Sequence, residues 1–154
     1  MSQSDNPEVI IFPPLLFGIA FLTAAVGTWM WPLPILAHPG RIWAGVAFLS
    51  FGIVLGVSSA MSLRKGGTNI SPAQPTTAII TSGPFRFSRN PLYIAGSLDF
   101  IGLSVIFNSL WGLLTFVPLL ILMHYGVILK EERYLEAKFG ESYRRYCSTV
   151  RRYL

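Results

Sequence analysis

Residues 91–129 read PLYIAGSLDFIGLSVIFNSLWGLLTFVPLLILMHYGVIL and contain one charged residue, Asp99. Asn108 and Ser109 divide this stretch into apolar segments of 17 and 20 residues, 91–107 and 110–129. An α-helix rises 1.5 Å per residue, so each segment can cross a hydrocarbon core of about 30 Å, the first only just. Because lipid cannot satisfy the open edge of a sheet, the stretch predicts two transmembrane helices in a tight antiparallel hairpin.

Two more apolar segments, at about 11–31 and 42–62, precede this hairpin. Charged residues make up 12% of the 154 residues, about half of the roughly 25% usual in globular domains. The mean hydropathy is +0.53. The sequence therefore predicts an all-α integral membrane protein with four transmembrane helices, formed by residues 1–154 as a single membrane domain. Asp5 and Glu8 stand where a cleavable signal peptide would be basic, so we interpret the first segment as a retained helix.

The same composition excludes several classes of protein. No alternation of strand and helix patterns and no G-x-G-x-x-G appears, which argues against a soluble dinucleotide-binding enzyme. Cys147 is the only cysteine, so a disulfide scaffold is excluded. His38, His124 and Cys147 are too few and too scattered for a zinc site, and we predict no metal.

The basic residues predict the orientation in the membrane. Of 12 Lys and Arg, only Arg41 lies between the first two segments, and the other 11 lie in residues 63–90 and 130–154. The positive-inside rule then predicts a multi-pass protein with both termini in the cytoplasm, in the bacterial inner membrane or, in a eukaryote, the endoplasmic reticulum. We assign the net charge of +5 to contact with anionic membrane lipids and predict no nucleic-acid partner.

Two polar pieces remain on the cytoplasmic side. Residues 63–90 are rich in glycine and proline and predict a loop. In residues 130–154, apolar side chains recur every three or four positions, and Gly140 interrupts the pattern. This spacing predicts a C-terminal amphipathic helical tail that lies on the membrane surface or caps the bundle.

These pieces contain two motif-like clusters. The first, residues 83–96, reads GPFRFSRNPLYIAG, and the second, residues 130–146, reads KEERYLEAKFGESYRRY. The hairpin returns the end of the fourth span to the start of the third. We therefore expect loop 63–90 and tail 130–154 to form one site.

This ordered pair of clusters resembles a family of integral membrane methyltransferases that includes isoprenylcysteine carboxyl methyltransferases and phospholipid N-methyltransferases. The resemblance covers residue 83 to about residue 152. It implies S-adenosyl-L-methionine bound at the cytoplasmic mouth, with a hydrophobic or lipid-like methyl acceptor entering from the bilayer. One departure concerns Asn90, where the isoprenylcysteine enzymes have histidine, because asparagine cannot act as a base at neutral pH.

The resemblance also implies roles for particular residues. Glu131 or Glu132 would hold the donor's amino group or ribose, and Arg89 would pair with its carboxylate. The implied cofactor-binding residues are Gly83, Pro84, Arg89, Asn90, Tyr93, Gly96, His124, Glu131 and Glu132. The predicted catalytic residues are Arg89, Glu131 and, because it is an ionisable residue in mid-span, Asp99.

Two of these residues have alternative interpretations. His124 precedes Glu131 by seven residues, close to two helical turns, so both can share a face and His124 can bind the cofactor or assist the acceptor. It can equally be a packed histidine bonded to a neighbouring helix. Asp99 lies mid-span, where an ionisable residue either contacts a polar acceptor head group or is a paired packing residue.

The sequence thus predicts an S-adenosylmethionine-dependent methyltransferase most like the isoprenylcysteine carboxyl methyltransferases. A phospholipid amine or a small thiol is an alternative acceptor. A different class also remains open: a sterol-reductase-like enzyme that uses NADPH, or a non-catalytic membrane module.

Overall fold

The computed structural model describes residue 7 and residues 9–153, so Asp5 and Glu8 lie outside the described residues. Within that part the regular structure is entirely helical. The elements in chain order are α1 (Pro13–Met30), α2 (Arg41–Lys65), the 3₁₀ turn η1 (Gly83–Arg86), α3 (Pro91–Ile106), α4 (Leu110–Met123), the π-helical turn η2 (His124–Ile128), α5 (Leu129–Phe139) and α6 (Glu141–Thr149).

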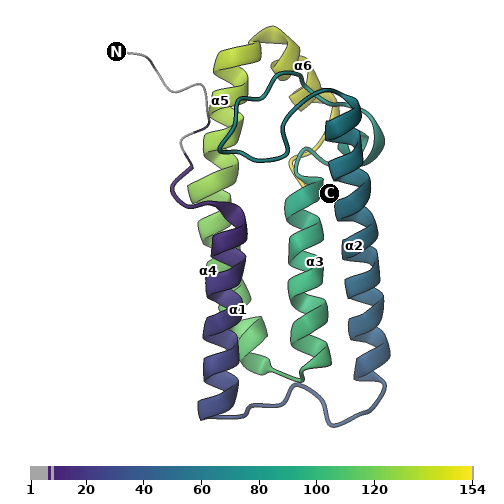
Figure 1. Cartoon of the computed structure of the whole chain (residues 1–154), viewed down its shortest axis with the longest axis vertical. Helices are drawn as coiled ribbons and strands as arrows, with labels where there is room; N and C mark the ends of the chain where they lie inside the picture. Colours follow the sequence, from purple (N-terminus) through teal and green to yellow (C-terminus); the bar gives the residue numbers. More distant parts are fainter. Residues whose placement is uncertain (1–6, 8, 154) are drawn as a thin grey trace.

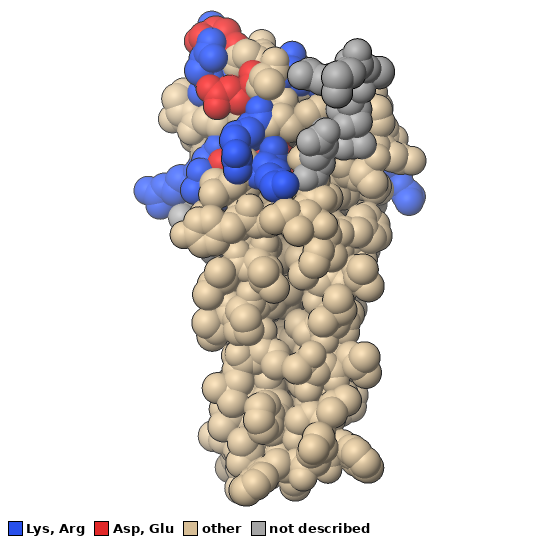
Figure 2. All heavy atoms as spheres, turned by 90° about the vertical axis from the view of Figure 1, so that its left-hand side faces the viewer, with Lys and Arg blue, Asp and Glu red and all other residues tan. Residues whose placement is uncertain are grey.

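Three helices are long and apolar enough to cross a membrane. They are α1 with 18 residues, α2 with 25, and the continuous helix Leu110–Phe139 with 30. The shorter α3 is apolar as well, with 16 residues. Their side surface is apolar, and the charged side chains visible in Figure 2 gather at one end of the molecule, here called the charged end. The chain is therefore an integral, multi-pass membrane protein.

The fourth helix runs further than the sequence predicts. Instead of ending near residue 129, α4 continues through η2 into α5, which projects at the charged end (Figure 1). Gly140, at φ 53° and ψ −122°, then ends α5 where the interrupted pattern predicted a break. A side chain is strongly disfavoured in that conformation, so glycine lets the chain turn sharply into α6.

The hairpin turn is as short as predicted, but its two helices pack mainly against other partners. Asn108 adopts φ 53°, and the Ser109 side chain caps α4 by accepting the Gly112 N–H at 3.2 Å. Beyond this turn, α3 lies along α2 and α4 lies along α1 (Figure 1). The buried core between α1, α3 and α4 consists of Leu16, Phe100, Leu119, Met123 and Val127.

Glycines explain why α2 and α3 pair so closely. A Cβ on Gly102 would meet the Gly45 carbonyl oxygen at 2.9 Å, and one on Gly52 would meet the Ala95 carbonyl oxygen at 2.9 Å. Backbone therefore lies against backbone along this pair, as small residues allow in membrane helices. The contact between α3 and α4 is much less extensive, and it includes the stacked rings of Phe100 and Phe116.

Candidate functional site

The two motif clusters meet at the charged end, as the hairpin predicted. The start of α3, the helices α5 and α6, the turn η1 and part of loop 63–90 enclose a pocket that contains charged side chains of both clusters, here called the polar pocket. Five of the predicted site residues line this polar pocket: Arg89, Asn90, Tyr93, Glu131 and Glu132. Loop 63–90 contacts α5 through a hydrogen bond in which the Thr76 N–H donates to the Tyr134 hydroxyl oxygen at 3.2 Å.

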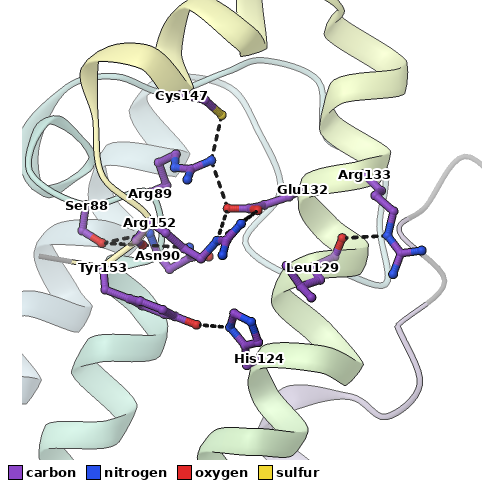
Figure 3. Close-up of polar contacts among 10 residues, drawn as sticks. All are labelled: Ser88, Arg89, Asn90, His124, Leu129, Glu132, Arg133, Cys147, Arg152 and Tyr153. Carbon is purple, nitrogen blue, oxygen red and sulfur yellow. Dashed lines mark hydrogen bonds and ion pairs between the residues drawn. The ribbon is translucent and has the colours of Figure 1, made fainter.

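Glu132 lies between two arginines (Figure 3). Its Oε1 is 3.0 Å from Arg89 Nη1, and its Oε2 accepts from Arg152 Nη2 at 2.7 Å. Arg152 Nε donates to the same carboxylate at 3.0 Å. The side chains of Arg89 and Glu132 are only 13% and 14% exposed. Two guanidinium groups already neutralise this carboxylate. Glu132 therefore has a structural role, because it links Arg89 at the start of α3 to Arg152.

Arg152 lies in the tail 130–154 that the sequence predicted to be part of the site, but it was not among the predicted site residues. Residues 150–153, here called the C-terminal strap, cross the start of α3. The Arg89 N–H donates to the Arg151 carbonyl oxygen at 3.0 Å, and Asn90 Nδ2 donates to the Arg152 carbonyl oxygen at 3.0 Å. In the sequence, Arg151 and Arg152 look like membrane-surface anchors, and no local signal distinguishes them from the other basic residues of the tail.

Glu131 has different surroundings from its neighbour. It lies in the charged part of the helix, beyond the apolar span that ends near residue 129. The Tyr93 hydroxyl donates a hydrogen bond of 2.6 Å to its Oε1. Burial raises the pKa of Glu131 to about 7, the Tyr93 hydrogen bond opposes the rise, and the charge of Glu132 adds to it. A carboxyl group of this kind, poised near neutrality inside a pocket, is typical of a functional site.

Arg89 has a buried donor atom without a partner among the described residues. Its Nη1 bonds Glu132 and also donates to Cys147 Sγ at 2.7 Å. Its Nε is buried and has no hydrogen-bond partner in the part of the chain that the structure describes. A buried N–H without a partner is costly, so this atom indicates where an anionic group of a ligand would be favoured.

Other predicted residues support the site from outside the pocket. Gly83, at φ 60°, packs on Ser62, and with Pro84 it forms the turn η1 that delivers Phe85 to the pocket wall. The Phe85 carbonyl oxygen accepts the Tyr146 hydroxyl at 2.7 Å. Gly96 faces Phe17 of α1. None of Gly83, Pro84 and Gly96 is among the described residues that line the pocket.

Asp99 also lies away from the polar pocket. It faces Gly52 of α2, and its Oδ1 is buried without a hydrogen-bond partner among the described residues. In the described part of the chain, no group of three or more His, Cys, Asp or Glu is arranged to hold a metal ion.

His124 lies at a second cavity. An apolar groove of about 460 Å³ runs between α3 and α4, and His124 lines it together with Tyr153 of the strap. His124 Nδ1 and the Tyr153 hydroxyl are 2.6 Å apart (Figure 3). The shared face expected for His124 and Glu131 assumed a regular α-helix, whereas η2 lies between them. One extra residue in a turn rotates the next part of the helix by roughly 100°, and the two side chains line different cavities.

Tyr93 connects the two cavities. It lines both the polar pocket and the apolar groove, and its hydroxyl bonds Glu131 on the pocket side. The protein therefore has a polar cavity and a groove between apolar helices that share one side chain as a wall.

These features define a class, the multi-pass helical membrane proteins with a polar site at one end of the bundle. Residues 40–142, which are 103 of the 154 residues, match the phospholipid methyltransferase family, and the chain belongs to this family. The matched region contains both motif clusters up to Ser142.

Two named proteins are similar over 99 residues, 64% of this chain. The cobalt-zinc-cadmium resistance protein CzcN of Cupriavidus metallidurans is 31% identical, and the match covers 45% of its length. The nickel-cobalt-cadmium resistance protein NccN of Alcaligenes xylosoxydans xylosoxydans is 28% identical, with 46% covered. The match thus spans about half the length of these relatives. No solved structure matches the chain.

Proposed function

We propose that the protein transfers a methyl group from S-adenosyl-L-methionine to an acceptor carried on an apolar, lipid-like molecule. The observation that carries this proposal is the position of Tyr93 in the wall of both cavities. A polar donor from the cytoplasm and an apolar acceptor from the bilayer would reach the same side chain from opposite sides. Methyl transfer needs this alignment and the exclusion of water.

The residues of the polar pocket fit the donor. When bound, the cofactor supplies a methyl group made electrophilic by its sulfonium. Glu131, whose one partner among the described residues is the Tyr93 hydroxyl, would hold the cofactor's amino group. The unpaired Nε of Arg89 would donate to its carboxylate. This division of labour favours Glu131 over Glu132 as the cofactor contact, since two arginines already engage Glu132.

The groove fits an apolar acceptor. Its lining from α3 and α4 is mainly aliphatic, and it adjoins helix faces that carry exposed apolar residues such as Leu122 and Val117. In a bilayer such faces contact lipid, so an acyl or prenyl chain could enter between α3 and α4 without crossing water. The acceptor groups to test first would be the carboxylate of a prenylated cysteine, the amine of a phospholipid and the thiol of a hydrophobic molecule.

We also propose that four helices cross the membrane: α1, α2, α3 and the apolar part of the helix Leu110–Phe139, which ends near residue 129. The 16 residues of α3 span about 24 Å, a little short of an average hydrocarbon core, and its neighbours on both sides are longer. The charged end would face the cytoplasm, with both termini on that side.

The test is binding of S-adenosylhomocysteine by calorimetry on protein in nanodiscs. We expect saturable binding by wild type, at least tenfold weaker binding by Glu131→Gln and Arg89→Ala, and unchanged binding by Glu141→Gln, whose carboxylate is exposed in α6. NADPH serves as the control ligand. Absence of binding by folded wild type would refute the proposal, and NADPH binding in its place would favour a reductase.

A further inference from the structure

The mouth of the apolar groove carries a pair of side chains that takes no part in the polar pocket. His124 opens the π-helical turn η2, and Tyr153 is brought to it by the C-terminal strap. The strap is held by Arg152 on Glu132 and by its carbonyl oxygens on α3. The strap is an extended segment after α6, and η2 is a π-helical turn after α4. A hydrogen bond of 2.6 Å between His124 and Tyr153 joins these two irregular segments.

Among the described residues that line the groove, His124 alone has a side chain that commonly acts as a general base. The other titratable groups there are the phenols of Tyr93, Tyr125 and Tyr153, which ordinarily keep their protons until about pH 10. No Asp, Glu, Lys or Arg is among these lining residues. The nearest carboxylates belong to Glu131, beyond Tyr93, and Glu132, beneath the strap.

This chemistry discriminates between acceptors. An apolar lining disfavours a charged head group of either sign. A carboxylate would find no Lys or Arg in the groove wall, and it has no proton for His124 to remove. An ammonium or a thiol, in contrast, becomes a neutral or anionic nucleophile when it gives up a proton, and His124 can take that proton.

Resting on the proposed methyl transfer, we infer that His124 is the general base that deprotonates the acceptor, that Tyr153 orients its ring, and that the acceptor is therefore a group that arrives protonated on an apolar chain. With the Nδ1 proton donated to the Tyr153 oxygen, the Nε2 lone pair is available to the acceptor. The pair is exposed on one side, and Tyr153 belongs to the strap that carries Arg152 at the charged end, so the proton would leave to water through this end.

For an amine, atoms and charges balance in this step. R–NH₃⁺ gives one proton to Nε2 and becomes R–NH₂. Its lone pair then forms the N–CH₃ bond while the C–S⁺ bond of the donor breaks and leaves its electron pair on sulfur. The products are R–NH₂⁺–CH₃, neutral S-adenosylhomocysteine and a histidinium that returns its proton to water.

The kinetic test uses protein in nanodiscs, labelled methyl donor and three acceptors: phosphatidylethanolamine, hexadecanethiol and S-farnesylthioacetate, the last a carboxylate. We expect His124→Asn to slow transfer to the amine or the thiol by roughly 10²–10⁴-fold and to remove its dependence on pH near neutrality. Tyr153→Phe should shift the pH midpoint with a smaller loss of rate.

His38→Asn, at the only other histidine, is the matched control and should retain the wild-type rate. S-adenosylhomocysteine affinity should stay within twofold in all three variants. Full activity of His124→Asn, or transfer to the carboxylate alone, would overturn the inference.

A second measurement does not depend on turnover. In His38→Asn protein, a ¹³C-histidine label reports His124 alone. Addition of hexadecylamine in the presence of S-adenosylhomocysteine should shift this resonance and its titration midpoint. An unmoved resonance in protein that binds S-adenosylhomocysteine would overturn the acceptor site and leave the methyltransferase proposal standing. Failure of S-adenosylhomocysteine to bind would instead remove the proposed function.

Discussion

Glu131 and Glu132 are adjacent in the sequence and have opposite surroundings in the structure. Glu132 pairs with Arg89 and Arg152, while Glu131 accepts one hydrogen bond from Tyr93. The motif predicts that both carboxylates belong to the site, but it cannot say which is free, because that depends on Arg152, 20 residues further along the chain. A pair of identical residue types thus divides into one that stabilises and one that is available to a ligand.

Loss of the Glu132 carboxylate should destabilise the protein. Glu132→Gln leaves the guanidinium of Arg89, which is only 13% exposed, without its ion partner. We expect the free energy of unfolding to fall by about 3 kcal/mol, measured by SDS titration in mixed micelles. Glu141→Gln is the matched control, because its pair with Arg144 is exposed and should be worth less than about 0.5 kcal/mol. Equal losses in the two variants would contradict this assignment.

The raised pKa of Glu131 predicts the pH dependence of cofactor binding. The carboxyl is mostly protonated below its pKa of about 7 and cannot then pair with an ammonium. S-adenosylhomocysteine affinity should therefore rise as the pH increases from about 6 to 8 and then level off. Without ligand, the same raised pKa means that stability is lost as pH rises through about 7, since the folded state holds this proton more tightly. Calorimetry at several pH values measures the first effect, and Glu131→Gln should abolish it; a persisting slope would assign it to another group.

At the scale of elements, the apolar runs predicted the helices well and their partners poorly. The observed bounds of α1, α2 and α3 lie within about three residues of the predicted segments, because hydropathy and length decide what can enter lipid. The pairing of α3 with α2 depends on Gly45 facing Gly102 and on Gly52 facing Ala95. These contacts join two chain segments, and neither segment reveals them alone. The apolar pattern did not predict the π-helical turn η2 either. Because of this turn, the side chains of His124 and Glu131 line different cavities.

Glycines at the α2–α3 contact provide a test of this packing. In Gly52→Ala the added methyl would collide with Asp99 Oδ1 and lie 2.9 Å from the Ala95 carbonyl oxygen, so the helices must move apart. We expect the free energy of unfolding in detergent to fall by about 1–3 kcal/mol, which thermal melting would detect as a lower Tm. Gly56→Ala, one turn further along α2, meets only the Ala95 Cβ at 3.4 Å and should be nearly neutral. Similar stability of both variants would mean that backbone contact does not hold this pair.

At the scale of the whole molecule, polarity is separated along the long axis. The visible charged side chains gather at one end (Figure 2), while four tryptophans, Trp29, Trp31, Trp43 and Trp111, lie at or near the other ends of α1, α2 and α4. Basic residues inside and aromatic residues at an interface are the usual arrangement in membrane proteins. The positions of the arginines in the sequence are sufficient to predict this asymmetry without any tertiary contact.

The proposed orientation can be measured by labelling. In a Cys147→Ser background, Leu36→Cys places one thiol on the exposed connection between α1 and α2, and Ser142→Cys places one in exposed α6. A membrane-impermeant maleimide added to intact spheroplasts should label only Leu36→Cys. In inverted vesicles the pattern should reverse. Labelling of both thiols from one side would contradict a four-span topology.

The wall formed by Tyr93 also bears on how such an enzyme would respond to its substrates. Tyr93 lines both cavities, so in the proposed function the donor would reach it from water and the acceptor from the plane of the membrane. The rate should then follow the bulk concentration of the donor, but the mole fraction of the acceptor among the surrounding lipids. Diluting the acceptor with inert lipid should slow turnover at constant total acceptor, whereas adding more membrane of the same composition should not.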